Sequence, residues 1–270
     1  MTRLDQELVT RGLARSRTHA AKLISDGKVS AGGAVVAKAS LQVDESTDLA
    51  VEAHLEDIYV SRAGHKLAGA LEAFPGVEPS GKRCLDAGAS TGGFTDVLLR
   101  RGASHVVAVD VGHGQLVPQL RGHPDVSVHE GLNVRYMKPE DIGGRVQLTV
   151  GDLSFISLTL VAYSLAQCTE PGGDVVLMVK PQFEVGKDRL SRTGVVSSEQ
   201  ERRRAVAQVG RASVDAGLEL MDLAMSPLPG QDGNVEYFLW MRRRMSELLP
   251  KIEERDEDVA ALINKLWPNQ

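Results

Sequence analysis

The chain has 270 residues, of which 42% are hydrophobic and 25% are charged, a composition typical of a folded globular protein rather than a disordered one. It contains no stretch of roughly 18 apolar residues and no basic start followed by an apolar segment. These features argue against membrane spanning and export, so we expect a cytoplasmic protein. Its two cysteines, Cys84 and Cys168, lack metal-ligand spacing, and we expect buried thiols and no bound metal.

The net charge of −5 argues against a protein that coats nucleic acid, but the charge is distributed unevenly. Residues 1–40 contain seven basic and three acidic side chains, whereas residues 41–60 contain six acidic and no basic ones. The local excess of positive charge over the first forty residues favours a small module that binds a polyanion. The same charges could instead form an ordinary solvated helix surface.

Two short helices and a hairpin are predicted within this basic segment. Apolar residues at helical spacing predict a first helix over residues 3–9, which Gly12 ends. Ser16 is a suitable N-cap for a second helix that Gly27 ends. Residues 28–36 then predict a hairpin with a glycine turn. Positive charge is expected around the start of the second helix, where free backbone N–H groups also favour a phosphate.

The same stretch resembles the S4 RNA-binding domain, which is found in ribosomal protein S4 and in pseudouridine synthases. The resemblance covers about residues 3–55 and is carried by R-L-D-x-x-L, G-L-A-R-S-R, A-x-x-L-I-x-x-G-x-V and the glycine hairpin. Residues 31–33, alanine followed by two glycines, depart from the usual pattern. The resemblance implies a small α+β RNA-binding domain over residues 1–58, a linker over 59–61, and RNA contacts from Arg3, Arg15, Arg17 and Lys22.

From about residue 60 onward, apolar strands alternate with helical stretches, which is the pattern of a doubly wound α/β sheet. The first five expected strands cover residues 82–86, 105–109, 126–130, 146–152 and 174–180. Each is followed by or ends in polar residues, at the edge of the sheet where ligands bind. No helix separates the last two expected strands, 218–224 and 235–241. An antiparallel hairpin there completes a seven-stranded sheet and places Glu236 inside it. A charged helix over 246–266, without an assigned function, ends the expected domain of residues 62–270.

A glycine-rich turn follows the first of these strands. Glycines at 88, 92 and 93 allow the backbone to approach a bulky cofactor closely. Asp110 ends the second strand, where an acidic residue accepts hydrogen bonds from the ribose of a nucleoside cofactor. The string D-A-G-A-S-T-G-G-F-T with Asp110 resembles the S-adenosylmethionine site of class I (Rossmann-like) methyltransferases. The resemblance implies S-adenosylmethionine as the cofactor, held by Asp86, Gly88, Ala89, Ser90, Gly92, Gly93, Phe94, Asp110, Asn133 and Asp152.

Four residues resemble the Lys-Asp-Lys-Glu tetrad of FtsJ-type ribose 2′-O-methyltransferases, namely Lys66, Asp152, Lys180 and Glu236. A ribose 2′-hydroxyl is a poor nucleophile, so methylating it requires positioning and the removal of one proton. A desolvated lysine near a second lysine could accept that proton without a metal. We expect Lys180 to be the acceptor and Lys66 to tune the charge. The two carboxylates would orient the lysines, although two surface lysines with ordinary ion-pair partners are the alternative.

Three basic residues and one aromatic residue lie beyond expected strand or helix ends and could contact RNA, namely Arg62, Arg135, Lys187 and Phe155. Phe155 could stack on a base swung out of its helix, because chemistry on a paired nucleotide usually requires extrusion. Packing of this ring in the core is an equally good interpretation. The three basic side chains could hold phosphates, or they could be solvated loop charges.

The order of these motifs resembles the TlyA family of ribosomal RNA cytidine-2′-O-methyltransferases. The resemblance runs over about residues 3–241 and includes D-L-S-F-I-S-L, V-K-P-Q-F-E-V-G-K and S-P-L-P-G-x-x-G-N-V-E-Y-F. It implies 2′-O-methylation of cytidine in ribosomal RNA, within one or both subunits or within ribosomes. Another RNA such as transfer RNA, a non-catalytic role in ribosome assembly, and the membrane activity suggested by the haemolysin name of some members are the alternatives.

Overall fold

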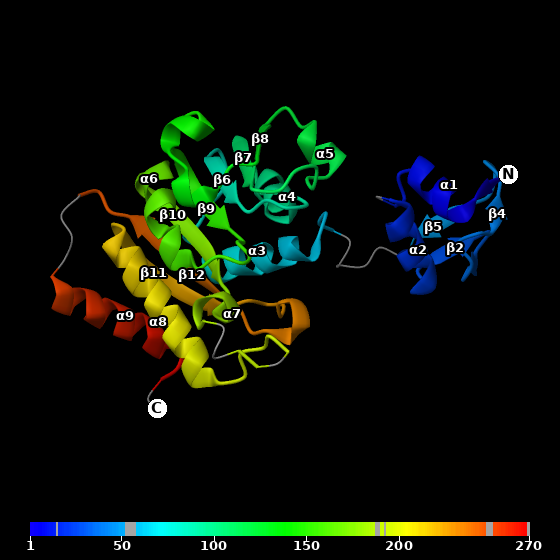
Figure 1. Cartoon of the computed structure of the whole chain (residues 1–270). Coiled ribbons are helices and arrows are strands. Elements are labelled where there is room, and N and C mark those ends of the chain that lie inside the picture. The colour runs from blue at the N-terminus through cyan, green and yellow to red at the C-terminus, as the bar shows by residue number, and fades with distance from the viewer. Residues whose placement is uncertain (15, 52–57, 187–189, 192, 247–250, 269–270) are drawn as a thin grey trace. The chain divides into compact units, whose positions relative to one another are not determined.

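The structure is a computed structural model that describes residues 1–14, 16–51, 58–186, 190–191, 193–246 and 251–268. It divides into two units, Met1–Ile58 and Tyr59–Gln270 (Figure 1). Residues 59–61, expected as a linker, are grouped with the second unit. There the backbone N–H of Val60 donates to Asp96 Oδ2 at 2.9 Å.

The N-terminal unit contains the two helices and the glycine hairpin that the sequence predicts. Its elements are β1 (Thr2–Arg3), α1 (Leu4–Thr10), α2 (Arg17–Ser25), β2 (Val29–Ala31), β3 (Ala34–Val35), β4 (Gln42–Val43) and β5 (Leu49–Val51). β1 pairs with β4, and β2 lies between β3 and β5, all antiparallel. Ser16 caps α2 by accepting from the backbone N–H of His19 at 3.1 Å. Gly32 and Gly33 turn the hairpin with φ of 57° and 80°.

This unit has its own small hydrophobic core. Leu4 and Leu8 of α1 are fully buried, and they lie one helical turn apart on the side of α1 that faces α2. The buried residues from α2 and the strands that complete the cluster are Ala20, Leu23, Ile24, Val29 and Val43. The apolar spacing seen in the sequence is therefore the spacing that closes the core.

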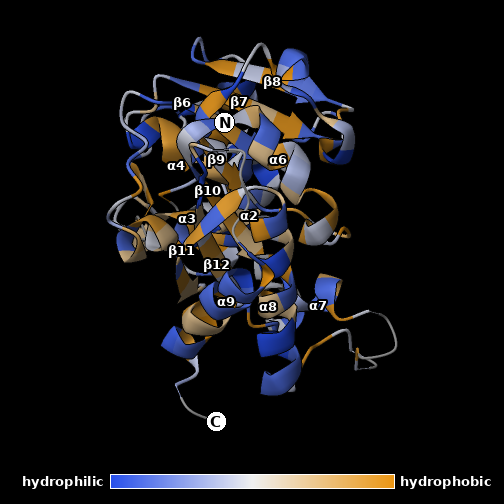
Figure 2. Cartoon of the chain, turned by 90° about the vertical axis from the view of Figure 1, so that its left-hand side faces the viewer, coloured by the Kyte–Doolittle hydropathy of each residue, from blue (hydrophilic) through white to orange (hydrophobic). Residues whose placement is uncertain are grey.

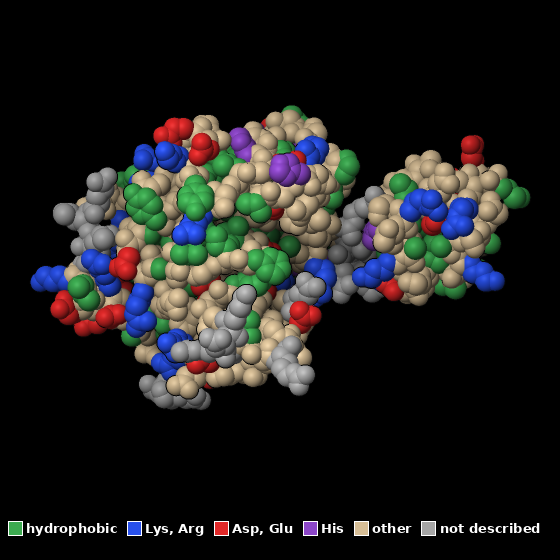
Figure 3. All heavy atoms as spheres, in the orientation of Figure 1, with side chains coloured by type: hydrophobic (Ala, Val, Ile, Leu, Met, Phe, Trp, Pro, Cys, Tyr) green, Lys and Arg blue, Asp and Glu red, His purple; other side chains and the backbone are tan. Residues whose placement is uncertain are grey.

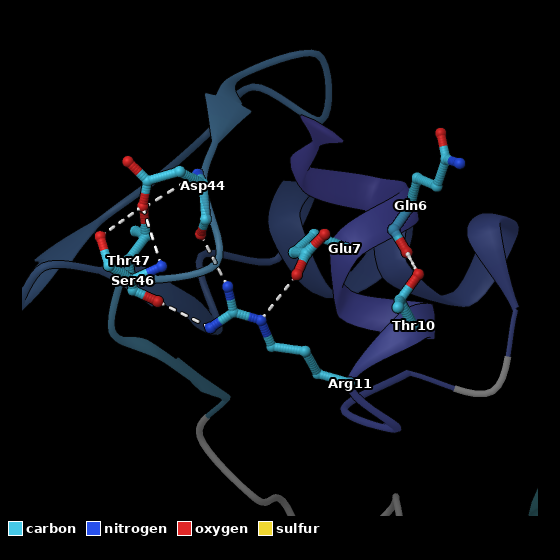
Figure 4. Close-up of polar contacts among 7 residues, drawn as sticks. All are labelled: Gln6, Glu7, Thr10, Arg11, Asp44, Ser46 and Thr47. Carbon is cyan, nitrogen blue, oxygen red and sulfur yellow. Dashed lines mark hydrogen bonds and ion pairs between the residues drawn. The ribbon is translucent and has the colours of Figure 1, made fainter. Parts of the chain in front are cut away.

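Arg11 ties α1 to the turn at residues 44–47 (Figure 4). Its Nε donates to Glu7 Oε1 at 2.8 Å, and its two Nη atoms donate to the carbonyl oxygens of Thr47 at 2.7 Å and Asp44 at 2.8 Å. The Asp44 carboxylate in turn accepts from the Ser46 hydroxyl at 2.7 Å, and such hydrogen bonds hold its pKa below the ordinary value. Arg11 is thus a structural residue, and the sequence-based count of basic residues overstates the charge available to bind RNA.

The second unit is built on a seven-stranded sheet, as expected. Its strands are β6 (Arg83–Ala87), β7 (His105–Asp110), β8 (Val126–Glu130), β9 (Val146–Gly151), β10 (Thr169–Val179), β11 (Leu218–Met225) and β12 (Tyr237–Arg243). Their order is β11-β12-β10-β9-β6-β7-β8. The pairings from β10 to β8 are parallel, whereas β12 runs antiparallel to both of its neighbours. The predicted fold class, a class I methyltransferase sheet preceded by a small α+β domain, is confirmed.

Helices cover both faces of this sheet. The α-helices are α3 (Arg62–Ala73), α4 (Gly93–Arg100), α5 (Pro118–Arg121), α6 (Ala162–Cys168), α7 (Pro181–Glu184), α8 (Glu199–Asp215) and α9 (Ile252–Leu266), and the short 3-10 helices are η2 (Val134–Tyr136), η3 (Pro139–Ile142), η4 (Leu158–Leu160) and η6 (Gln231–Gly233). Val176 and Met178 of β10 pack with α3 and α4. Val175 and Leu177 pack with α6, α8 and α9. This alternation follows from the two-residue period of a strand, and Figure 2 shows the strands largely orange between bluer helices.

Two expected elements are shifted along the chain. β12 begins at Tyr237, so Glu236 lies just before the strand instead of inside the sheet. The expected charged helix at 246–266 is α9, which begins at Ile252, and residues 247–250 lie outside the described residues. α9 buries Val259, Leu262 and Ile263 against α8 and β11. None of the described helices is long and apolar enough to cross a membrane.

We predict that Arg11→Met loosens the N-terminal unit, because two backbone carbonyls and one carboxylate lose their donors. The expected loss is roughly 1–2 kcal/mol of local stability. Amide hydrogen exchange in residues 42–51 should accelerate, while exchange in the seven-stranded sheet stays unchanged. Arg100→Met is the matched control, since Arg100 is more than half exposed and contacts Asp96. Equal exchange rates in the two variants would contradict this structural role of Arg11.

Candidate active site

A cavity of about 630 Å³ opens at the carboxyl ends of β6, β7 and β9, within the size range of small-molecule sites. It is lined by Gly88, Ser90, Asp110, Val111, Gly112, Gln115, Asn133, Val134, Asp152, Leu153, Ser154, Phe155, Ile156 and Val161. A second pocket of about 140 Å³ shares Gly88, Ser90, Asp152 and Ser154 with it and adds Ala89, Gly93 and Phe94. The structure therefore brings eight of the ten residues expected at the cofactor site to these two pockets.

The glycine-rich turn after β6, here called the glycine cradle, lies so close to neighbouring segments that a side chain on it would clash with them. Gly88 has φ of 87°, and a Cβ atom there would lie 2.8 Å from the carbonyl oxygen of Asp152. A Cβ on Gly93 would lie 2.3 Å from Ser61 Oγ. Ser61 Oγ is buried, has no hydrogen-bond partner among the described residues, and lines the smaller pocket. A glycine cradle with an unsatisfied hydroxyl beside it fits a bulky polar ligand.

Asp110 stands at the end of β7 on the cavity wall. Its Oδ2 accepts from the backbone N–H of Ser90 at 2.8 Å, and its Oδ1 accepts from that of Gly112 at 2.7 Å. The carboxylate thus joins the turns after β6 and β7 at the cavity wall. Asn133 also lines the cavity, and its side chain accepts from the backbone N–H of Arg135 at 3.0 Å.

Asp86 lines neither pocket and lies in the protein interior near the end of β6. It is fully buried, and its Oδ2 accepts from the Thr95 hydroxyl at 2.6 Å, while its Oδ1 has no partner among the described residues. Burial raises the pKa of this carboxyl to about 7, and the negative charge of Asp152 adds to that effect. Gly92, with φ of 97°, also lies outside the pockets and turns the chain into α4 close to Leu116 and Leu120.

Lys66 and Glu236 form a buried ion pair. Lys66 Nζ donates to Glu236 Oε2 at 2.6 Å, and their side chains are 11% and 2% exposed. Lys66 comes from α3, and Glu236 comes just before β12. Because β12 is antiparallel, its beginning lies at the edge where the parallel strands end. Gly230 lies against this carboxylate, since a Cβ at Gly230 would be 2.2 Å from Glu236 Oε1.

Lys180 and Asp152 form a second ion pair at the ends of β10 and β9. Lys180 Nζ lies 2.6 Å from Asp152 Oδ1 and donates to Ser154 Oγ at 2.8 Å. The lysine side chain is 10% exposed, and the aspartate is 18% exposed. All four residues of the expected tetrad are therefore held in pairs, and the alternative of two lysines on an open surface does not describe their surroundings.

Two further polar residues at this site were missed in the sequence. Ser154 accepts from Lys180, and Gln182 Nε2 donates to Glu236 Oε1 at 3.3 Å. Both stand inside motifs that were recognised, D-L-S-F and K-P-Q-F-E, two residues after a tetrad member. Their position beside Asp152 and Lys180 was therefore a usable signal. What the sequence did not indicate is that Gln182 contacts a residue 54 positions away.

Phe155 projects from the loop after β9 and is 92% exposed, with φ of 62°. The interpretation of this ring as part of the core is therefore wrong. Its ring centroid lies 5.2 Å from that of Phe183. Arg62 is exposed at the start of α3, and exposed Arg135 lies over the ring of Tyr136 at 5.6 Å. Lys187 lies outside the described residues.

In the N-terminal unit, Asp5 forms ion pairs with two of the residues expected to contact RNA. Arg3 Nε donates to Asp5 Oδ1 at 3.0 Å, and Arg17 Nη2 donates to Asp5 Oδ2 at 2.9 Å. The two guanidinium groups lower the pKa of Asp5 to about 2, yet they remain 43% and 59% exposed. Lys22 is exposed on α2, and Arg15 lies outside the described residues. Figure 3 shows several Lys and Arg side chains on the face of this unit that is turned toward the viewer.

Comparison with known proteins assigns both units to families. The S4 domain family matches residues 2–49, and the FtsJ-like methyltransferase family matches residues 59–243. The 16S/23S rRNA (cytidine-2′-O)-methyltransferase TlyA of Mycobacterium tuberculosis is 53% identical over 247 residues, which are 92% of each chain. The chain belongs to the TlyA family. As a TlyA-family member with an FtsJ-like domain, it is a methyltransferase that uses S-adenosylmethionine as the methyl donor.

Other relatives of this TlyA-family protein bear a different name. Hemolysin A of Brachyspira hyodysenteriae is 35% identical, over 87% of this chain and 97% of that protein. A solved structure, a proposed hemolysin from Streptococcus thermophilus, matches with a TM-score of 0.70 at 35% identity and covers 98% of this chain and 96% of its own. The family, the enzyme class and the methyl donor expected from the sequence are confirmed by these comparisons together with the family matches.

We predict that Asp86→Asn flattens the pH dependence of stability. The folded protein binds the Asp86 proton more tightly than the unfolded chain, whose carboxyl pKa is about 3.9. The stabilisation is therefore full below about pH 4 and is lost as the pH rises to about 7. Between about pH 4 and pH 7, the free energy of unfolding of the wild type should decrease by at most roughly 4 kcal/mol more than that of the variant. Denaturant unfolding measured across this pH range tests the prediction, with Asp258→Asn on the exposed side of α9 as control. Parallel plots of unfolding free energy against pH for wild type and Asp86→Asn would contradict it.

Proposed function

We propose that this enzyme methylates the ribose 2′-hydroxyl of cytidine in ribosomal RNA. The observation that carries the proposal is the pair of buried lysine–carboxylate contacts at the edge of the sheet, where Asp152 belongs both to the cavity wall and to a lysine pair. The relative that is 53% identical is named for this reaction on 16S and 23S rRNA. Its name supports cytidine and ribosomal RNA as substrates of the present chain.

The donor would lie along the glycine cradle and the β7 end of the cavity. Gly88, Ala89, Ser90, Gly93 and Phe94 would contact it through the turn after β6. The Asp110 carboxylate suits the two hydroxyls of a nucleoside ribose, and Asn133 offers an amide to the adenine. Asp86 would act by holding the turn. When bound, S-adenosylmethionine supplies a methyl group that is already electrophilic.

The chain's own residues would then hold the 2′-hydroxyl and take its proton. Lys180 in its neutral form would accept the proton at Nζ as the oxygen is methylated, and the resulting ammonium is stabilised by Asp152 at 2.6 Å. Ser154, 2.8 Å from the same Nζ, fixes the orientation of that group. Glu236 pairs with Lys66 at 2.6 Å, so that this second lysine would take its place at the site without leaving an unpaired buried charge.

RNA contacts would come from both units. Phe155, exposed at the rim of the cavity, offers a ring on which an extruded cytosine can stack. Exposed Arg62 and Arg135 could hold the phosphates that flank it. In the N-terminal unit Arg3, Arg17 and Lys22 present the exposed positive charge. Arg15 and Lys187 are proposed with them from the sequence alone.

The substrate is tested with labelled S-adenosylmethionine and separated small subunits, large subunits, intact ribosomes and transfer RNA from cells that lack the enzyme. We expect label at the 2′-oxygen of cytidine in ribosomal RNA from one or both subunits. Lys180→Ala should lose at least roughly a hundredfold in transfer rate, in line with the loss of a general base, while donor binding measured by calorimetry persists. Label found only in transfer RNA would contradict the proposal that ribosomal RNA is the substrate.

Lys82→Ala is the control for the Lys180 experiment. Lys82 also pairs with an aspartate, since its Nζ lies 3.2 Å from Asp174 Oδ2, but it precedes β6 and so stands at the other edge of the sheet. Its removal deletes a comparable ion pair away from the cavity, and transfer should stay within about twofold of wild type. Retained activity in Lys180→Ala, or an equal loss in both variants, would remove Lys180 from the reaction.

We predict that Arg17→Ala weakens RNA binding and makes it less sensitive to salt. A side chain that contacts one phosphate contributes about one unit to the slope of log affinity against log salt. Affinity for a ribosomal RNA fragment should therefore fall and that slope should decrease by about one. Arg211→Ala is the matched control, because Arg211 is 56% exposed and also pairs with one aspartate. An unchanged slope for Arg17→Ala would exclude a phosphate contact.

A further inference from the structure

Three residues of the segment after β10 contact the loop after β9. Lys180 contacts Asp152 and Ser154, the ring of Phe183 lies against that of Phe155, and Glu184 accepts from Ser157 and Leu158. The contacts occur in the same order along both segments. The exposed ring of Phe155 is thus flanked on each side by residues that the second segment holds in place.

Glu184 makes the last of these contacts from inside the protein. Its Oε1 accepts from the backbone N–H of Leu158 at 2.8 Å, and its Oε2 accepts from the Ser157 hydroxyl at 2.5 Å. The residue is only 8% exposed. A buried carboxyl group is costly unless its hydrogen bonds are made, so this side chain strongly favours the one loop position that supplies both donors.

The loop needs such an anchor because its backbone is unusual. Phe155 has φ of 62°, a left-handed conformation that bulky residues without special support rarely adopt. The ring is 92% exposed and gains little from burial. The conformation therefore has to be maintained by neighbours, and Ser154 on one side and Ser157 with Leu158 on the other are the neighbours that are held.

We propose that Glu184 is a positioning residue that fixes the 153–158 loop so that Phe155 is presented to the RNA before the RNA binds. This inference rests on the proposed function of Phe155 as the platform for the extruded base. Glu184 is not among the residues that line the cavity, and it is not a catalytic residue. Its effect is to avoid the loss of conformational entropy that ordering the loop during binding would cost.

The first test compares Glu184→Leu, which removes both acceptors at similar volume, with Glu184→Gln. The amide oxygen of Gln can accept from Leu158, and its NH₂ can donate to Ser157 Oγ, so Glu184→Gln should stay within about threefold of wild type. Glu184→Leu should lose roughly 10- to 100-fold in kcat/KM for RNA, mainly through KM, with donor affinity unchanged. Ser164→Ala is the control, because it removes a buried hydrogen bond from α6 to the carbonyl oxygen of Met137.

A second readout does not depend on turnover. Amide hydrogen exchange in residues 153–158 should accelerate at least about tenfold in Glu184→Leu and remain unchanged in Ser164→Ala. Ser157→Ala, a milder change, should accelerate the same amides to a smaller extent. Unchanged exchange in both Glu184→Leu and Ser157→Ala would overturn the proposal even if activity fell.

A double-mutant cycle separates this proposal from the proposed function. If Glu184 acts through Phe155, then Phe155→Ala with Glu184→Leu should lose no more kcat/KM than Phe155→Ala alone. Losses that multiply would overturn the positioning role. Should wild type fail to methylate ribosomal RNA, the proposed function falls, whereas accelerated exchange in Glu184→Leu would still establish Glu184 as the anchor of this loop.

Discussion

Two lysine side chains are buried at the carboxyl edge of the sheet, and each lies 2.6 Å from a carboxylate oxygen. Removing one partner of such a pair leaves an uncompensated buried charge, which costs about 3–5 kcal/mol. The architecture supplies both partners from separate elements. Asp152 and Lys180 come from the ends of neighbouring parallel strands. Lys66 and Glu236 come from α3 and from the residue before an antiparallel strand.

The reversal of β12 therefore has a chemical role as well as a topological one. In a sheet made only of parallel strands, a residue that precedes a strand lies at the edge opposite the ligand site. Glu236 precedes its strand and still reaches Lys66, because the strand runs the other way. The close approach of Gly230 to the same carboxylate limits where that carboxylate can lie. Chain direction and one missing side chain together set its position.

Much of this arrangement could be predicted from the sequence, because three of the four tetrad residues and the glycine turn adjoin apolar runs that had to be strands. The boundaries were less certain. The expected strand at 235–241 begins two residues late, since Val235 belongs to the apolar run but the Asn234 side chain instead holds the loop by accepting from the backbone N–H of Val196 at 3.0 Å. The pattern of apolar residues alone does not predict such a side-chain contact.

The sequence did not allow us to predict which residues the polar side chains contact. Arg11 is one of the seven basic residues counted over the first forty positions, but its donors are used within the unit. Glu184 was recognised only as a letter in a motif, and its contacts with Ser157 and Leu158 span 27 and 26 positions. Such pairings depend on which elements meet in space. The spacing of residues along one element determines that element, whereas the meeting of two elements depends on the whole fold.

The Lys66–Glu236 contact also bears on how the enzyme matures during its synthesis. The two residues are 170 positions apart, so the contact cannot form until Glu236 has left the ribosome that makes the chain, and long-range contacts of this kind close late in folding. The glycine turn and Asp110 are complete much earlier in translation. A nascent chain would thus carry the parts that hold the donor well before it carried the full set of charges needed to use it.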